Sequence, residues 1–230
     1  MSHRSYAVLV SGGLDSAILL GDALRTRVGQ AFLSAITPIY VRCGLSWESV
    51  EFTYLERFLE ALHCPTLRPL VVLDQPIADV YGPHWSITGK SVPDAASADE
   101  AVFLPGRNLL LLAKPLLWCH LQCVPALALG SLQTNPFRDA TPKFFRGLQE
   151  LVNQAMQGSV EVRLPLGGMK KVEVMQMGKG LPLEYTFSCI APINGLHCGL
   201  CNKCAERKDA FVHASMVDPT KYAEKSLASG

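Results

Sequence analysis

Residues 6–18 have the sequence YAVLVSGGLDSAI, in which a short apolar run ends at two adjacent glycines and is followed at once by Asp15 and Ser16. A continuous run of small aliphatic residues is typical of a strand that is buried on both faces. After Ser16 the apolar side chains recur at helical spacing. The stretch therefore predicts a strand, a tight glycine turn and a helix.

The glycine turn predicts a site for phosphate groups. Gly12 and Gly13 carry no side chains where the backbone must turn and approach a ligand. The N–H groups that open the helix carry positive partial charge, and Ser11 and Ser16 add hydroxyl groups. Asp15 is an unusual neighbour for phosphate, and it either holds Mg²⁺ or caps the helix. Neither the Walker A pattern nor G-x-G-x-x-G is present.

The rest of the chain alternates between strand-like and helix-like patterns. Further strands are expected at residues 32–41, 67–73, 125–132 and 160–166. Helices are expected at residues 16–26, 47–62, after Asn108 with a kink at Pro115, from Pro142 to Met156 with Thr141 as N-cap, at 170–178 and at 202–213. Alternation of this kind predicts parallel strands joined by right-handed crossovers. The fold class is therefore α/β, with a doubly wound, mostly parallel five-stranded sheet that binds ligands at its carboxyl edge.

Composition restricts the class of protein. The chain has 230 residues, of which 49% are hydrophobic and 18% charged, so we expect a folded domain with a small appendage at most. A net charge of +1 makes nucleic acid an unfavourable partner. Polar residues and prolines interrupt the apolar stretch at 109–129, namely Lys114, Pro115, His120, Gln122 and Pro125. The stretch therefore predicts a buried helix and strand rather than a membrane span. No apolar leader follows the N-terminus, so the cytoplasm is the expected location.

Residues 74–105 fit neither the strand nor the helix pattern. They are rich in Pro, Ala, Ser and Asp. We expect a long excursion here, with a mobile flap over the active site as its function.

Eight cysteines are many for a chain in a reducing compartment. Four are scattered among apolar residues and are expected in the core, namely Cys43, Cys64, Cys119 and Cys123. The other four have the spacing C-x8-C-x2-C-x2-C, namely Cys189, Cys198, Cys201 and Cys204. Four thiolates this close together predict a closed, structural Zn²⁺ site. An iron–sulfur cluster is the alternative, and His197 is an alternative ligand.

Several stretches together resemble known families. "SGGLDS" resembles the PP-loop, the pyrophosphate-binding signature of the ATP pyrophosphatase superfamily. Paired with the C-terminal cysteine cluster, it resembles the 7-cyano-7-deazaguanine synthase family. Between these ends, similar stretches are FLPGRN at 103–108, ALALGSLQTNPFRDATPKFFRGL at 126–148, KKVEV at 170–174 and LPLEYTFSC at 181–189.

The resemblance implies a fold and an activity. Residues 1–185 would form a PP-loop ATP-binding domain of the adenine nucleotide alpha hydrolase type, and residues 186–230 a zinc-binding helical segment. The enzyme would be an ATP-dependent carbon–nitrogen ligase of queuosine biosynthesis, with Mg²⁺ bound to ATP. It would convert 7-carboxy-7-deazaguanine and ammonia to 7-cyano-7-deazaguanine through an adenylated carboxylate. The sequence does not fix the oligomeric state, and a homodimer is one expected assembly.

The resemblance also implies site residues. ATP would contact Val10, Ser11, Gly12, Gly13, Leu14, Asp15, Ser16, Arg107 and Asn108. Catalysis would use Asp15, Ser16 and Lys171, and the acid would contact Tyr40, Arg42 and Asp139. Several residues have an ordinary alternative. Arg107 and Asn108 also suit the substrate or a plain helix start, Lys171 a solvated helix and Asp139 an ordinary loop, while Trp47 either stacks on a base or belongs to the core.

The sequence departs from the family where the substrate is expected. The family usually has YGQ after its second strand, whereas here Val41 and Arg42 follow Tyr40, and Phe187 replaces a tryptophan. We therefore expect the deazaguanine acid to be handled less well than by a typical member. Two functions of other classes compete. One is a PP-loop enzyme that modifies tRNA directly, and the other is a nucleotide-binding partner protein with weak catalysis.

Overall fold

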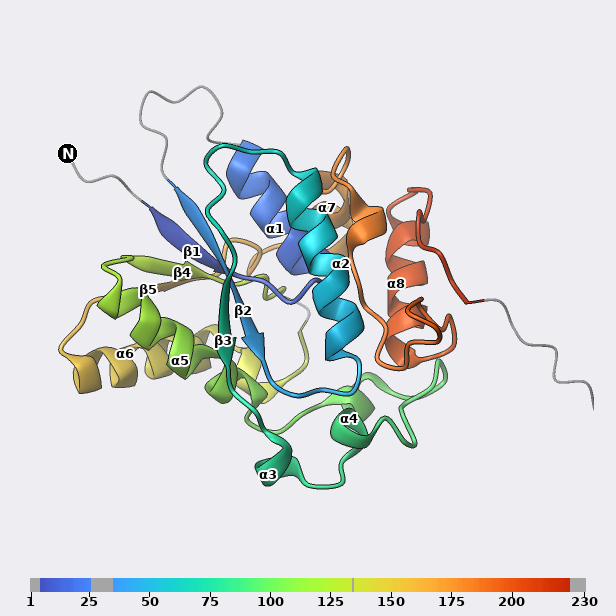
Figure 1. Cartoon of the computed structure of the whole chain (residues 1–230), viewed down its shortest axis with the longest axis horizontal. Helices are drawn as coiled ribbons and strands as arrows, with labels where there is room; N and C mark the ends of the chain where they lie inside the picture. Colours follow the sequence, from blue (N-terminus) through green and yellow to red (C-terminus); the bar gives the residue numbers. More distant parts are fainter. Residues whose placement is uncertain (1–4, 26–34, 134, 224–230) are drawn as a thin grey trace, which may run out of the picture.

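The computed structural model describes residues 5–25, 35–133 and 135–223. Five parallel strands form one sheet in the order β3-β2-β1-β4-β5 (Figure 1). Their bounds are β1 Tyr6–Leu9, β2 Ile36–Arg42, β3 Val71–Asp74, β4 Ala126–Ala128 and β5 Glu161–Arg163. The chain moves outward from β1 to β3, then crosses back to β4 and β5. The predicted doubly wound sheet is confirmed, and its order reverses between β1 and β4.

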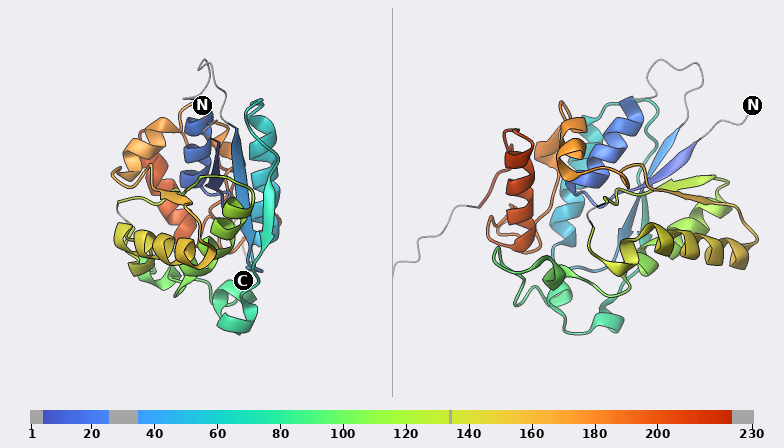
Figure 2. Two further views of the ribbon diagram at one scale, coloured as in Figure 1. Left: turned by 90° about the vertical axis from the view of Figure 1, so that its left-hand side faces the viewer. Right: turned by 180° about the vertical axis from the view of Figure 1, so that it is seen from behind.

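Helices pack on both faces of the sheet (Figure 2). One core holds Val8 and Tyr40 from the strands, and the other holds Ala7 and Ile39, because successive strand residues face opposite sides. The longer helices are α1 Leu14–Arg25, α2 Glu48–Ala61, α5 Arg107–Leu121, α6 Pro142–Met156, α7 Lys171–Met177 and α8 Asn202–His213. Side chains of α1, α2, α7 and α8 reach the first core, and those of α5 and α6 the second.

The predicted helices are present in the structure, with small differences in where they begin and end. Thr141 caps α6, because its Oγ1 accepts a hydrogen bond from the Phe144 N–H at 3.2 Å. Pro115 lies inside α5, which continues to Leu121. The apolar stretch at 109–129 thus forms a helix and then β4, as expected. In the described ranges, no helix is both long and apolar enough to cross a bilayer.

Four strand predictions need qualification. The strands expected at 125–132 and 160–166 are shorter than predicted and comprise only Ala126–Ala128 and Glu161–Arg163. The strand expected at 67–73 begins only at Val71, because Pro69 has no N–H for the ladder and Leu67 forms just an isolated bridge with Ile36. The strand expected from Phe32 is described from Ile36 onward, and residues 32–34 lie outside the described ranges, as does Thr26 at the end of the first helix.

The scattered cysteines do not all lie in the core. Cys43 and Cys119 are buried as expected. Cys64 is only half-buried and Cys123 is exposed, because Cys123 sits in the turn after α5 with a φ of 55°. The expectation of a core thiol is therefore wrong for Cys123, whereas Cys64 packs against the first core but is only partly buried.

Residues 74–105 form folded structure rather than a bare loop. They contain α3 Ala78–Tyr81, α4 Trp85–Thr88 and a 3₁₀ turn at Asp99–Val102. In Figure 1 they lie below α2 and below the loop that precedes α8. Trp85 stacks on Trp47 with ring centroids 5.8 Å apart. The Asn202 side chain donates to the Ser97 carbonyl at 2.9 Å. The excursion is thus tied to the C-terminal cysteine segment, and its predicted mobility stays a prediction.

The C-terminal segment packs against the sheet domain. Helix α8 contacts α7, and the Phe187 N–H donates to the Gly12 carbonyl at 2.8 Å. This second contact joins the approach to Cys189 directly to the glycine loop. The domain boundary at residue 185 stays a prediction.

Candidate active site

The predicted phosphate loop lies between β1 and α1, at the point where the strand order reverses. Gly12 has a φ of +75°, which glycine adopts without strain. The Ser16 hydroxyl accepts from the Ser11 N–H and donates to the Gly13 carbonyl, each at 3.2 Å. Ser11, Gly13 and Ser16 line a cavity beside the first turn of α1. The loop is therefore shaped to receive an anion at the α1 N-terminus.

A cavity of about 340 Å³ opens over this loop at the carboxyl ends of β1 and β4. A second cavity of about 400 Å³ adjoins it toward residues 99–104 and 135–139. The two share several wall residues and form one two-lobed cleft. The shared residues are Asp15, Arg107, Asn108, Gly130, Asn135, Lys203 and Glu206.

Asp15 and Lys171 form an ion pair on the wall of the first lobe. Lys171 Nζ lies 2.7 Å from Asp15 Oδ1, and both side chains are about a quarter exposed. Asp15 belongs to the first turn of α1, and Lys171 is the first residue of α7. The fold thus brings together two of the three predicted catalytic residues from opposite ends of the chain. The lysine neutralises the carboxylate that seemed out of place beside phosphate.

Arg107, Asn108 and Asp139 meet where the two lobes join. Arg107 is the first residue of α5, and its buried Nε has no hydrogen-bond partner among the described residues. The Asn108 N–H and side-chain amide donate to Asp139, to Oδ2 at 3.1 Å and to the carbonyl at 2.9 Å. Among the described residues no hydrogen bond to Asp139 Oδ1 is found, and the residue lines the second lobe. The structure therefore clusters these three predicted contacts.

Tyr40 and Arg42 are not among the residues that line the cleft. Tyr40 is buried, and its hydroxyl donates to Glu51 at 3.4 Å. Arg42 is exposed, lies 3.6 Å from Asp74 Oδ1 and stacks over the Phe52 ring. Val41 is buried in an apolar cluster. The predicted substrate contacts of Tyr40 and Arg42 stay predictions without a wall position to support them.

The cleft also contains charged residues that the sequence analysis missed: Glu51, Lys203, Glu206 and Arg207. A signal existed for two of them. Glu51 lies on the same face of α2 as Tyr54, Leu55 and Phe58, and Arg207 lies three residues after Cys204 on the buried face of α8. A charged residue on the apolar face of a helix indicates a buried interaction or a site.

Glu51 is a buried carboxyl group on the wall of the first lobe. Its side chain is packed against the glycine loop, since a Cβ on Gly12 would lie 3.2 Å from Glu51 Cγ. Burial raises the pKa of Glu51 to about 8, although the Arg107 guanidinium opposes the shift. The Tyr40 hydroxyl and the Trp47 side chain donate hydrogen bonds to it. The carboxyl group therefore changes charge near neutral pH.

The raised pKa of Glu51 predicts a pH-dependent stability difference. Because the folded chain holds this proton more tightly than the unfolded chain, the stabilisation is complete below about pH 4.5 and is lost as pH rises toward 8. Glu51→Gln, which stays neutral, should have a higher free energy of unfolding than the wild type at pH 8.5. This difference, measured by urea denaturation, should exceed the difference at pH 5 by at least about 1 kcal/mol. Glu60→Gln, exposed on the same helix, should show no such trend. Equal differences at both pH values would contradict the shift.

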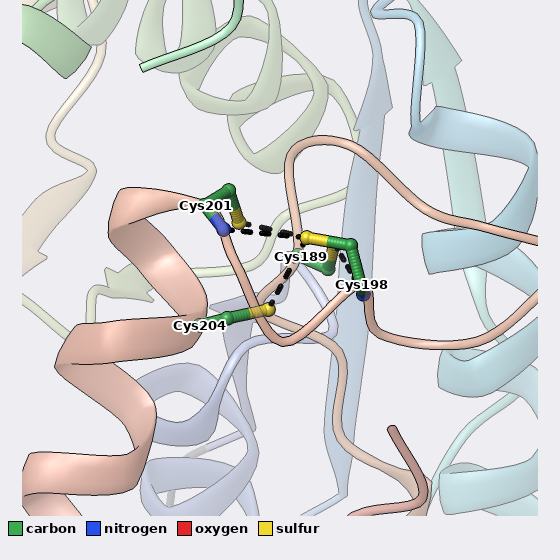
Figure 3. A group of neighbouring side chains, drawn as sticks. All are labelled: Cys189, Cys198, Cys201 and Cys204. Atoms are coloured by element: carbon green, nitrogen blue, oxygen red, sulfur yellow. Dashed lines mark hydrogen bonds between the residues drawn. The ribbon is translucent and has the colours of Figure 1, made fainter. Parts of the chain in front are cut away.

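The four clustered cysteines are all buried and converge on one point (Figure 3). Their sulfur atoms lie within 4.8 Å of one another, with 3.9 Å between Cys189 and Cys201 and 4.0 Å between Cys198 and Cys204. Backbone N–H groups of Ala191, Cys198, Leu200 and Cys201 donate to sulfur at 3.3–3.4 Å. Such donors stabilise thiolates, which are the form that binds metal.

The cysteine geometry fits a tetrahedral metal ion. Zinc–sulfur bonds of about 2.3 Å place the sulfurs of a tetrahedron about 3.8 Å apart, close to the separations observed. His197 is outside the group, because its Nε2 accepts from the Ser188 N–H at 3.1 Å. The geometry of the four cysteines therefore suits metal binding, as the spacing predicts.

The metal-binding loop positions the start of α8, which begins one residue after Cys201. Lys203 and Glu206 extend from its first turns into both lobes. Arg207 is 1% exposed and donates to the Thr220 and Thr186 hydroxyl groups at 2.6 and 2.9 Å. The cysteine centre thus supports one wall of the cleft.

Comparison with known proteins gives a consistent family. Residues 5–215 match the family model of the queuosine biosynthesis protein QueC. A 7-cyano-7-deazaguanine synthase of Saccharophagus degradans is 29% identical over 97% of this chain and 100% of its own length. Synthases of Syntrophobacter fumaroxidans and Methanothermobacter thermautotrophicus are 30% and 28% identical over 96% and 94% of this chain, and 97% and 98% of their own lengths.

One solved structure shares the fold at low identity. It is the U34-tRNA thiolase NcsA from Methanococcus maripaludis with its 4Fe–4S cluster, with a TM-score of 0.51 and 13% identity. The match covers 93% of this chain and 68% of the thiolase. At this identity the likeness shows a shared fold and nothing of function.

Proposed function

Because the chain belongs to the QueC family of queuosine biosynthesis proteins, we propose that it is an ATP-dependent 7-cyano-7-deazaguanine synthase. Its substrates would be 7-carboxy-7-deazaguanine, ammonia and ATP. The observation that carries the proposal is the two-lobed cleft, in which the glycine loop and a heterocycle-sized lobe share one charged wall. Each lobe suits one of the two large substrates.

The first lobe is assigned to ATP. Residues Val10–Ser16 would hold the phosphates through backbone N–H groups and the two serine hydroxyls. Lys171 would neutralise charge that develops on the departing pyrophosphate. Mg²⁺ bound with ATP would be held by Asp15, whose carboxylate suits that ion. These assignments are supported by the shape of the loop and the ion pair beside it.

The second lobe is assigned to the acid. Phe103 and Phe137 line it and stack on each other with ring centroids 5.0 Å apart, which gives a flat apolar wall. Asp139 Oδ1 would accept from N–H groups of a heterocycle. The unpartnered Nε of Arg107 would donate to a carboxylate or a phosphate at the junction. Positioning and charge stabilisation are what the protein would supply.

The chemistry would take two activations. The acid's carboxylate displaces pyrophosphate from ATP, and ammonia then displaces AMP to give an amide. In the second round the amide oxygen displaces pyrophosphate from a second ATP, and loss of AMP, which carries that oxygen away, together with both protons of the amide nitrogen gives the nitrile. The cysteine centre would hold one structural Zn²⁺ outside this chemistry. The cytoplasmic location and the homodimer stay predictions.

A direct tRNA-modifying activity has less support. The thiolase likeness concerns the fold, and the net charge of +1 gives little attraction for a polyanion. A nucleotide-binding partner protein with weak catalysis would need only the first lobe, and it would not explain the charged residues where the two lobes join. Pyrophosphate release stimulated by the acid separates both alternatives from the synthase.

The test is a steady-state assay with ATP, ammonium and 7-carboxy-7-deazaguanine. We expect acid-dependent pyrophosphate release and formation of the nitrile, detected by mass spectrometry. A kcat/KM of about 10⁴ M⁻¹s⁻¹ or more would refute the divergence expected from Val41 and Arg42, whereas a much lower value would support it. ATP cleavage that does not respond to the acid would overturn the proposed function.

A further inference from the structure

The cleft holds one buried carboxyl group to which the assignments above give no role. Glu51 is 8% exposed, lies against Gly12 of the phosphate loop and lines the first lobe. It faces the junction with Arg107, where the phosphates and the acid would meet. A carboxylate so near the phosphates is unfavourable unless it serves a positive or proton-bearing reactant.

The surroundings of Glu51 favour a small cation. Its charged and titratable neighbours are Tyr40 in β2, Cys43 just after β2, Glu48 on α2 and Arg107 on α5. With both glutamates ionised, two carboxylates face one guanidinium, which leaves one negative charge unbalanced. The Trp47 side chain also lines the lobe and donates a hydrogen bond to Glu51.

The acid–base strength of Glu51 fits a proton transfer. An ordinary carboxylate is much too weak a base to take a proton from ammonium. Burial raises the pKa of Glu51 to about 8, which brings it toward that of ammonium and near the pH at which the enzyme works. The same group can then accept a proton and release it again within one turnover.

We propose that Glu51 binds ammonium in the cleft and takes its proton, which releases ammonia as the nucleophile. This role rests on the proposed function. Glu51 carboxylate and NH₄⁺ become carboxylic acid and NH₃. The nitrogen lone pair forms the C–N bond to the acyl adenylate as the C–O bond to AMP breaks. The excess proton on nitrogen leaves with the AMP phosphate, and Glu51 returns its own proton to water when the products depart.

The test compares the wild type with Glu51→Gln in the amide-forming step. At pH 7.5 the variant should show an apparent KM for total ammonium at least tenfold higher, with the difference shrinking at pH 9.5, where free ammonia is plentiful. Hydroxylamine is largely uncharged at neutral pH and needs no deprotonation. Hydroxamate formation by the variant should therefore stay within about threefold of the wild type, which a merely structural role would not produce.

The neighbouring carboxyl group supplies the matched control. Glu48 accepts hydrogen bonds from the Cys43 and Gly44 N–H groups and is not among the wall residues. Glu48→Gln should lower thermal stability without the rise in KM for ammonium. An unchanged KM in Glu51→Gln, an equal loss with hydroxylamine, or the same pattern in Glu48→Gln would overturn the assignment.

A separate half-reaction distinguishes the two levels of proposal. Exchange of labelled pyrophosphate into ATP needs the acid but no ammonium. If the wild type shows this exchange and Glu51→Gln shows the expected rise in KM for ammonium, the assignment of Glu51 stands. If the wild type shows no acid-dependent exchange, the proposed function falls, and the assignment of Glu51 falls with it.

Discussion

Cys201→Ser should lower the free energy of unfolding by more than about 4 kcal/mol, a loss expected when a metal centre fails. The freshly purified wild type should carry about one zinc ion per chain, and the variant much less. The four cysteines are buried, and their sulfur atoms lie within 4.8 Å of one another. Removal of one sulfur weakens metal binding and leaves three buried thiolates without a metal ion to balance their charge. Because metal binding to such a site is folding free energy, yield should fall along with stability. Urea denaturation and elemental analysis measure both.

Cys123→Ser is the control for this change. Cys123 is exposed and lies outside the cluster, so its replacement should alter stability by no more than about 0.5 kcal/mol. Iron in place of zinc would show an iron–sulfur centre, and a metal-free fresh preparation would contradict a metal site altogether. A stable Cys201→Ser with low activity would instead indicate that the centre only orients α8.

The glycine stretch predicted the fold because its signals are local. A buried strand, a glycine turn and a helix each depend on residues within a few positions of one another. Alternation of such units then restricts the sheet to a parallel, doubly wound order. The cysteine cluster was predictable for the same reason, since its four ligands lie within sixteen residues, from Cys189 to Cys204.

Features that depend on distant contacts were not predictable in this way. The 74–105 excursion owes its structure to partners such as Asn202 and Trp47, far away in the sequence. Glu51 gained its raised pKa from burial by the glycine loop and β2. Arg42 was expected at the substrate because it stands where the family usually has the glutamine of YGQ. Strand alternation places it on the same face as Tyr40, but it is the exposed last residue of β2, where it meets Asp74 and the Phe52 ring.

Lys171→Met should lower kcat for pyrophosphate release by at least about a hundredfold, and Asp15→Ala or Ser16→Ala by at least about tenfold, or 1.4 kcal/mol. Lys171 lies 2.7 Å from Asp15 at the rim of the phosphate loop, where charge accumulates as pyrophosphate departs. A lysine placed there lowers the energy of the transition state more than that of bound ATP. The loss should therefore fall on kcat, with a smaller change in KM for ATP.

Lys170→Met is the matched control, since this neighbouring lysine is exposed and its contribution to the α7 start is the backbone N–H that donates to Glu173. It removes the same charge one residue away and should leave kcat nearly unchanged. Thermal unfolding should barely distinguish the two lysine variants, because a partly exposed ion pair adds little stability. An equal loss of kcat in Lys171→Met and Lys170→Met would show that Lys171 acts only through its positive charge in this region and not through its position beside Asp15. Normal turnover in Asp15→Ala and Ser16→Ala would mean that the glycine loop is a turn and nothing more.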